Sequence, residues 1–140
     1  MKLLFRHISI VLLMLFISCD GEYPKKIVGN YIIDYDGNSY TCLFKDGQLY
    51  TISGDIVLYS YDSTFITVKQ KPVQKITDSI QADINYTYTL DEIEKGIKEY
   101  KKFCYWIVQI SNDSLIGPLN KSEFEITRKK LKISDELRLD

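Results

Sequence analysis

The sequence contains a single histidine, His7, and this residue lies in a segment that we predict to be removed from the mature chain. Without an imidazole, the mature chain cannot build a Ser-His-Asp or Cys-His nucleophile pair or a histidine-based zinc site. The sequence also lacks a Cys-x-x-Cys redox pair and a glycine-rich loop followed by Lys-Ser or Lys-Thr for binding phosphate groups. We therefore expect no cofactor and no metal site, and we favour a protein without catalytic activity.

Residues 1–18 have the order of a secretory signal peptide. Lys2 and Arg6 precede an apolar run over 8–17, and a small residue, Ser18, follows the run. The run is about half the roughly 20 residues that a membrane-spanning helix needs. Residues 15–19 resemble the lipobox of bacterial lipoproteins, so we expect cleavage before Cys19 and lipid attachment to its thiol. The alternative is an ordinary signal peptide that is cleaved elsewhere.

Cleavage before Cys19 leaves residues 19–140, with 16 basic and 19 acidic side chains and a net charge of −3. This balance gives no reason to expect nucleic-acid binding. We predict a lipid-anchored protein of the bacterial cell envelope, at the surface or the periplasmic face of the outer membrane. The inner membrane is an alternative because Asp20 follows the cysteine. The expected partners are the membrane, through the lipid on Cys19, and either an envelope protein or a glycan.

Residues 19–26 are predicted to be a flexible tether, and residues 27–140 a single globular α+β domain. Segments rich in β-branched and aromatic residues alternate with turn residues, which predicts an antiparallel meander over 27–34, 40–44, 48–52, 56–61 and 64–70. Strands are also predicted over two later segments. Period-two alternation predicts one over 80–88, and a continuous apolar run predicts another over 103–110. We expect the second of these strands to be covered on both faces.

Two helices are predicted from capping boxes. Thr89 with Glu92, and Asn120 with Glu123, have the spacing in which each side chain caps the backbone of the other residue. The first helix should run to about residue 100 and the second to about 131. We expect the basic residues of these helices and their flanks to be solvated: Lys98, Lys101, Lys102, Arg128, Lys129, Lys130 and Lys132. The fold class is therefore α+β, a mostly antiparallel β-sheet with one or two packed helices.

Three segments occur in an order similar to that of a known family: Tyr-Asp-Ser-Thr-Phe-Ile-Thr-Val-Lys-Gln over 61–70, Tyr-Trp-Ile-Val over 105–108 and Gly-Pro-Leu-Asn over 117–120. They resemble small Bacteroidetes lipoproteins with a domain of unknown function, and the resemblance covers residues 61–139. It implies the lipoprotein location and an α+β fold. It implies no activity and no functional residues.

Two cysteines remain once Cys19 carries a lipid. Cys42 and Cys104 both lie in predicted strands, and an oxidising compartment permits a disulfide between them. Closing a loop of this length would stabilise the fold by roughly 4 kcal/mol in the chain-entropy model. The alternative is two free thiols packed as small apolar groups.

Tyrosine is unusually abundant, with eleven residues. Tyr59, Tyr61, Tyr86 and Tyr88 lie on predicted strands, where an exposed row of rings would bind a protein partner or stack on sugars. The alternative is that these rings only pack the sheet, since tyrosine is common in strands.

Three Asp-Ser pairs resemble the Asp-Ser/Thr-apolar sites that Bacteroidetes O-glycosylate, which makes Ser63, Ser79 and Ser114 candidate modification sites. Asp-Ser is also common in turns. Taken together, the sequence favours a non-catalytic protein-binding or structural accessory of the envelope. The first alternative is a glycan-binding module, and the next is a small hydrolase that uses paired carboxylates.

Overall fold

The computed structural model of the chain describes residues 23–37, 40–48, 50–82 and 86–140. The predicted signal peptide, the predicted lipid site at Cys19 and residues 19–22 of the predicted tether lie outside these ranges. Among the described residues, no helix has the length and apolar character needed to cross a membrane.

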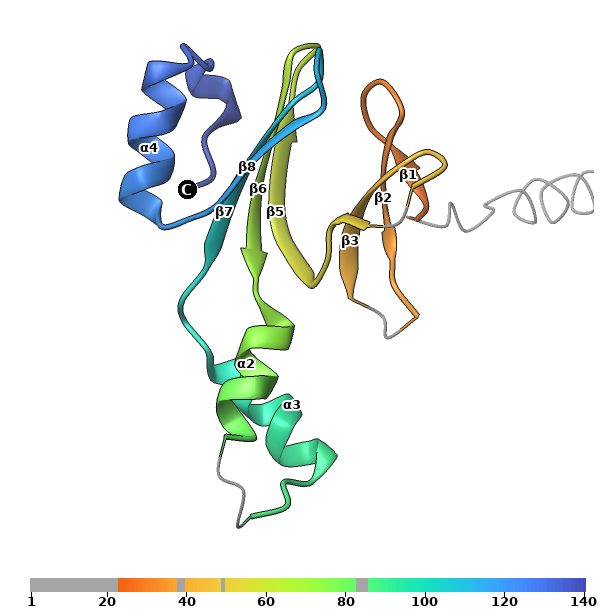
Figure 1. Ribbon diagram of the computed structural model, residues 1–140, viewed down its shortest axis with the longest axis vertical. Helices are drawn as coiled ribbons and strands as arrows, with labels where there is room; N and C mark the ends of the chain where they lie inside the picture. The colour runs from red at the N-terminus through yellow and green to blue at the C-terminus, as the bar shows by residue number, and fades with distance from the viewer. Residues whose placement is uncertain (1–22, 38–39, 49, 83–85) are drawn as a thin grey trace, which may run out of the picture.

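Eight strands form two antiparallel sheets, each of four strands in sequential order. The first sheet contains β1 (Lys25–Lys26), β2 (Tyr31–Tyr35), β3 (Thr41–Lys45) and β4 (Tyr50–Ile52). The second contains β5 (Asp55–Tyr61), β6 (Phe65–Lys71), β7 (Cys104–Gln109) and β8 (Ser114–Leu119). Figure 1 shows the two sheets side by side in two layers, with α2, α3 and α4 outside them. The predicted α+β class with mostly antiparallel strands is confirmed.

The predicted meander divides into two sheets after β4. At this point Gly54 has a positive φ of 100°, and a Cβ atom there would lie 2.7 Å from Gln70 Nε2 and 3.4 Å from the Lys71 carbonyl oxygen. Only glycine fits so close an approach in this conformation. The chain can therefore leave β4 and begin β5 in a separate layer.

The main core lies between the two sheets. Its buried residues come from both layers: Tyr31, Ile33, Leu43 and Ile52 from the first sheet, and Ile56, Ile66, Val68 and Val108 from the second. A second core covers the other face of the second sheet. In it, Tyr105 and Ile107 of β7 pack against Phe124 of α4 (Lys121–Lys130) and against Leu137 and Leu139 near the C-terminus. The prediction that residues 103–110 form a strand with both faces covered is confirmed.

Both predicted capping boxes form. Glu92 N–H donates to Thr89 Oγ1 at the start of α3 (Leu90–Glu99), and Glu123 N–H donates to Asn120 Oδ1 at the start of α4. Strand β8 runs through Gly117 and Pro118. It is an edge strand, and its register with β7 shifts between Ile116 and Leu119, so Pro118 occupies an irregular edge position of the kind that tolerates proline.

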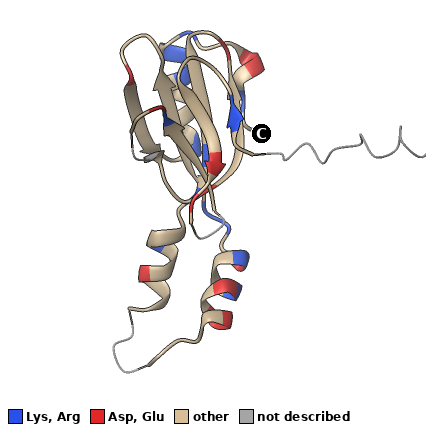
Figure 2. Cartoon of the chain, turned by 90° about the vertical axis from the view of Figure 1, so that its right-hand side faces the viewer, with Lys and Arg blue, Asp and Glu red and all other residues tan. Residues whose placement is uncertain are grey.

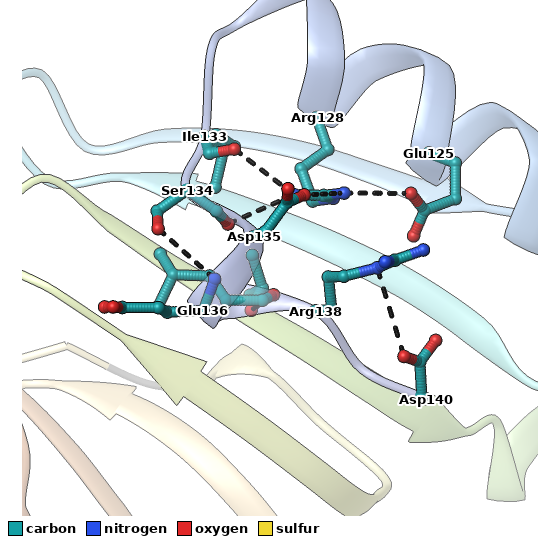
Figure 3. Close-up of polar contacts among 10 residues, drawn as sticks. Glu125, Arg128, Ile133, Ser134, Asp135, Glu136, Arg138 and Asp140 are labelled. Carbon is teal, nitrogen blue, oxygen red and sulfur yellow. Dashed lines mark hydrogen bonds and ion pairs between the residues drawn. The ribbon is translucent and has the colours of Figure 1, made fainter.

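Arg128 is buried, so the prediction that it belongs to a solvated basic run is wrong. Its Nη1 donates to the carbonyl oxygens of Ile133 and Ser134 at 3.2 and 3.1 Å, and its Nη2 contacts the carboxylates of Glu125 and Asp135 at 3.1 and 2.9 Å. Figure 3 shows this cluster, which ties the C-terminal segment and the 3₁₀ helix η1 (Asp135–Leu137) to the end of α4. The guanidinium can be buried because the carbonyls of the turn after α4 replace water as its hydrogen-bond acceptors.

The turn itself has the Schellman pattern. Lys132 takes a positive φ of 55°, Lys132 N–H donates to the Lys129 carbonyl, and Ile133 N–H donates to the Arg128 carbonyl. The chain thereby reverses directly after α4 and returns along the second sheet.

The prediction of a strand over 80–88 is wrong in the described part of that segment. Residues 73–80 form a helix, α2 (Val73–Ile80), and residues 86–89 belong to no strand. Val73, Ile76 and Ile80 recur at helical spacing, which places them together against Ile97 of α3. Residues 83–85 lie outside the described ranges. The α2–α3 hairpin extends from one end of the sheets (Figure 2).

The structured domain also begins earlier than predicted. Lys25 and Lys26 form β1 and pair with Ile33 and Ile32 of β2, so they do not belong to a flexible tether. Tyr23, Ile27 and Val28 pack against the main core. Burial of these apolar side chains holds the entering chain on the sheet.

Candidate functional site

The predicted Tyr59–Tyr61 pair lies on the edge strand β5. The two rings are nearly parallel, with centroids 6.4 Å apart and an interplanar angle of 14°. Tyr59 is half-buried against the main core, whereas 38% of Tyr61 is exposed. The main core thus holds one ring and the other faces solvent.

A second pair of tyrosines, not identified from the sequence, lies on the first sheet. The rings of Tyr23 and Tyr35 meet edge to face, with centroids 4.6 Å apart, and 48% of Tyr35 is exposed. Pairing of β1 with β2 places Tyr23 beside Tyr35, because the register Lys25–Ile33 continues in that direction. This contact depends on strand pairing across the chain, which no local pattern reveals.

Lys25 connects the two pairs. Its Nζ lies 5.7 Å from the centroid of the Tyr59 ring, a cation–π distance. The pKa of Lys25 is raised above its ordinary value, first by a hydrogen bond with the Tyr59 hydroxyl and then by the nearby hydroxyls of Tyr61 and Tyr23. We call Tyr23, Lys25, Tyr35, Tyr59 and Tyr61 the tyrosine patch. It includes residues of β1 and β5, each of which is one of the two edge strands of its sheet.

The predicted Tyr86–Tyr88 pair lies elsewhere. These rings also meet edge to face, at 4.6 Å, and the Tyr86 hydroxyl donates to Glu92 Oε1 at 2.8 Å. They precede α3, at the end of the α2–α3 hairpin farthest from the sheets (Figure 1). The structure therefore places the four predicted tyrosines at two separate sites.

The two cysteines predicted to form a disulfide are free thiols in the structure. Cys42 Sγ–H, in the first sheet, donates to the carbonyl oxygens of Tyr40 and Gly54, both at 3.4 Å, and Cys104 opens β7 in the second sheet. Burial raises the pKa of both thiols, so both are protonated at neutral pH. Cys42 is buried, as in the alternative of packed thiols, whereas Cys104 is half-buried and lines two cavities.

The three candidate glycosylation serines differ in exposure. Ser63 is exposed in the β5–β6 turn, where Asp62 Oδ1 accepts from Thr64 N–H and Phe65 N–H at 2.6 and 2.8 Å. Ser79 is exposed near the end of α2, and Ser114 is half-buried at the start of β8. Ser63 is the most accessible turn residue of the three, and its modification stays a prediction.

Three cavities surround the junction between the sheets and the hairpin. One of about 390 Å³ contains the side chains of Gln70 and Trp106, and Trp106 Nε1–H donates to Gln70 Oε1 at 2.7 Å. A second cavity, of about 560 Å³, shares Pro72, Lys75, Cys104 and Pro118 with the first. A third, of about 610 Å³, lies against α3. Within the described ranges, no three His, Cys, Asp or Glu side chains gather as a metal site would require.

A family model described as a protein of unknown function, DUF3997, matches residues 28–140. The match covers nearly all of the folded domain, which extends the predicted resemblance toward the N-terminus and agrees with a domain of unknown function. No curated protein and no solved structure matches the chain.

Proposed function

The chain belongs to the DUF3997 family, and from its geometry we propose that it is a non-catalytic binding protein that holds a protein partner on the tyrosine patch. In this proposal a lipid on Cys19 attaches the protein to the bacterial cell envelope, at the outer membrane. The observation that carries the proposal is the presence of two tyrosine pairs, Tyr23–Tyr35 and Tyr59–Tyr61, with Lys25 lying over the Tyr59 ring.

Tyrosine is enriched at the energetic centres of protein interfaces, because its ring buries much area while its hydroxyl keeps a hydrogen-bond partner. In the patch, ring contacts and the main core already hold the rings in place. A partner therefore loses little side-chain entropy in ordering them.

A protein partner is favoured over a glycan by the neighbouring side chains of β5. On the same edge strand Val57 is 44% exposed, and Leu58 is 38% exposed on the face opposite to Tyr59 and Tyr61. Such aliphatic side chains gain from burial by another apolar surface, whereas a hydroxylated sugar offers them little. An edge strand that exposes aromatic and aliphatic side chains has the apolar character that marks a protein-binding site.

The test is affinity capture of the tagged full chain from solubilised native membranes, read by quantitative mass spectrometry. Tyr35→Ala/Tyr61→Ala removes the two exposed rings of the patch, and Tyr86→Ala/Tyr88→Ala is the matched control. We expect one protein near stoichiometric yield with the natural chain and the control, and its loss by about tenfold or more with the patch variant.

Equal loss in both variants, or no partner with the natural chain, would overturn the proposal. Binding of the natural chain to a neutral glycan array, abolished by Tyr35→Ala/Tyr61→Ala, would also overturn it and assign the patch to sugars.

A further inference from the structure

The cavity of about 560 Å³ lies where the α2–α3 hairpin joins the second sheet. The segment between α3 and β7 forms one wall, the end of β8 with the start of α4 forms another, and Pro72 with Lys75 closes it from the α2 side. Its volume is within the range of small-ligand sites, about 300–1,000 Å³.

The charge of its walls has one sign. Four lysines line this cavity, Lys75, Lys101, Lys102 and Lys121, and no aspartate or glutamate does. In the part of the chain that the structure describes, none of these four lysines forms an ion pair with a carboxylate. We call this cavity the lysine groove.

Composition alone does not produce this separation, since the whole chain has a net charge of −1. The cavity of about 610 Å³ against α3 provides an internal comparison. Three lysines line it, Lys71, Lys95 and Lys98, but so do three acids, Asp55, Asp91 and Glu94. The two cavities thus differ in charge, and of the two only the lysine groove has no acidic side chain in its walls.

The other walls of the lysine groove are aromatic and apolar. Tyr100, Phe103 and Tyr105 line it together with Pro118 and Leu119. Lys69 Nζ lies 4.9 Å from the Phe103 ring centroid and adds a further positive charge near this wall. Tyr105 is buried against Phe124, so the accessible rings are the half-buried Tyr100 and Phe103. Such rings beside ammonium groups suit a ligand with a compact ring and an attached anionic group.

The capping box at the start of α4 occupies two of the backbone N–H groups nearest this site. The capping box already occupies Asn120 N–H with Glu123 Oε2, at 2.8 Å, and Glu123 N–H with Asn120 Oδ1, at 3.0 Å. The Glu123 carboxylate also offsets the positive end of the helix dipole. Recognition of an anion would therefore rest on the lysine side chains.

We propose that the lysine groove binds a sugar-sized ligand that carries a phosphate or carboxylate group. The lysines pair with the anionic group, and the aromatic wall contacts the ring that carries it. The inference does not depend on the tyrosine patch, which lies on other elements.

Isothermal titration calorimetry of the full chain in detergent tests the inference with four probes: inorganic phosphate, glucose 6-phosphate, glucuronic acid and uncharged glucose. The fluorescence of Trp106, the single tryptophan, provides a second signal, because Trp106 lines the adjoining cavity. We expect at least one anionic sugar to bind more tightly than inorganic phosphate, no binding of glucose, and weaker binding at higher salt.

Lys101→Gln/Lys102→Gln should weaken binding of that anionic sugar by about tenfold, because two ammonium groups that would pair with the anion are lost. Both lysines are exposed, so their replacement leaves the fold intact. Lys95→Gln/Lys98→Gln makes the same change in net charge in the charge-balanced cavity and should alter the affinity by less than about twofold. Tighter binding of glucose 6-phosphate would indicate a preference for phosphate, and tighter binding of glucuronic acid a preference for carboxylate. Equal weakening by both variants, or no binding of either acidic sugar, would overturn the proposal.

Discussion

The two-sheet sandwich and the α2–α3 hairpin hold their side chains in different ways. The sandwich has a core on both faces of its second sheet, and the buried polar residues Thr67, Gln70 and Arg128 all belong to it and its covering layer. The hairpin has one small cluster with three buried residues, Val73, Ile76 and Ile97. A side chain on the sandwich is therefore positioned by many more contacts.

The two predicted tyrosine pairs show what this difference means. Both have the pattern Tyr-x-Tyr, yet Tyr59 packs on the main core beneath Lys25. Tyr86 is instead 51% exposed, and its contacts are a hydrogen bond to Glu92 and the Tyr88 ring. The same local pattern thus yields a supported pair on a sheet and a less supported pair before a helix. A pre-positioned surface favours binding, which is why the proposed function rests on the first pair.

The largest expected effect comes from the outer core of the sandwich. Phe124→Ala removes a buried ring that stacks on Tyr105 with centroids 5.1 Å apart, and should lower the free energy of unfolding by about 3–5 kcal/mol. Ile126→Ala, on the exposed side of the same helix, should change it by less than about 0.5 kcal/mol. Chemical denaturation of both variants measures the difference, and equal effects would contradict the assigned faces of α4.

A smaller and more local effect is expected in the hairpin. Ile76→Ala empties part of the α2–α3 cluster and should cost about 2–4 kcal/mol of local stability. Amide hydrogen exchange should then speed up in α2 and α3 while the amides of β6 and β7 keep their protection. Uniform acceleration across both regions would show that the hairpin and the sandwich unfold as one unit.

The smallest effect is a pH dependence that belongs to the sandwich. Hydrogen bonds from Lys45 Nζ and the Tyr31 hydroxyl, at 2.5 and 2.8 Å, lower the pKa of Asp113 below its ordinary value. Since the pKa is lower in the folded state, this contribution to stability is present above about pH 4 and is lost as the pH falls through the folded-state pKa.

Asp113→Asn should therefore flatten the decline in stability below about pH 4, measured as the free energy of unfolding against pH. The same hydrogen bond and burial raise the pKa of Tyr31 to about 12, burial being the larger cause. In Asp113→Asn the Tyr31 phenol should titrate at a lower pH than in the natural chain. An unchanged acid slope and an unchanged phenol titration would contradict the contact.

Much of the fold could be predicted from local patterns. The capping boxes at Thr89 and Asn120 located the starts of α3 and α4, since a cap depends on residues three positions apart. The alternation over 80–88 misled because Ile80 belongs to a helical repeat that begins at Val73, before the alternation starts. The division into two sheets falls at Gly54, which approaches Gln70 closely, and such a contact between distant residues has no local pattern.

The tyrosine patch could be predicted only in part. Tyr59 and Tyr61 were identified because they share one strand, whereas Tyr23 and Tyr35 meet only through pairing of β1 with β2. Arg128 was misassigned for a related reason: its acceptors are carbonyls that the turn after α4 brings back toward it. Contacts that form through long-range strand pairing or chain reversal cannot be predicted from local sequence patterns.

The most direct test of the proposed function is site-specific photo-crosslinking in intact cells. A photo-reactive phenylalanine analogue is placed at Tyr61 in one version of the full chain and at Tyr86 in another, since both side chains are exposed. The proposal predicts one dominant protein crosslinked from position 61 and none of that protein from position 86. The same protein crosslinked equally from both positions, or no protein from position 61, would contradict it.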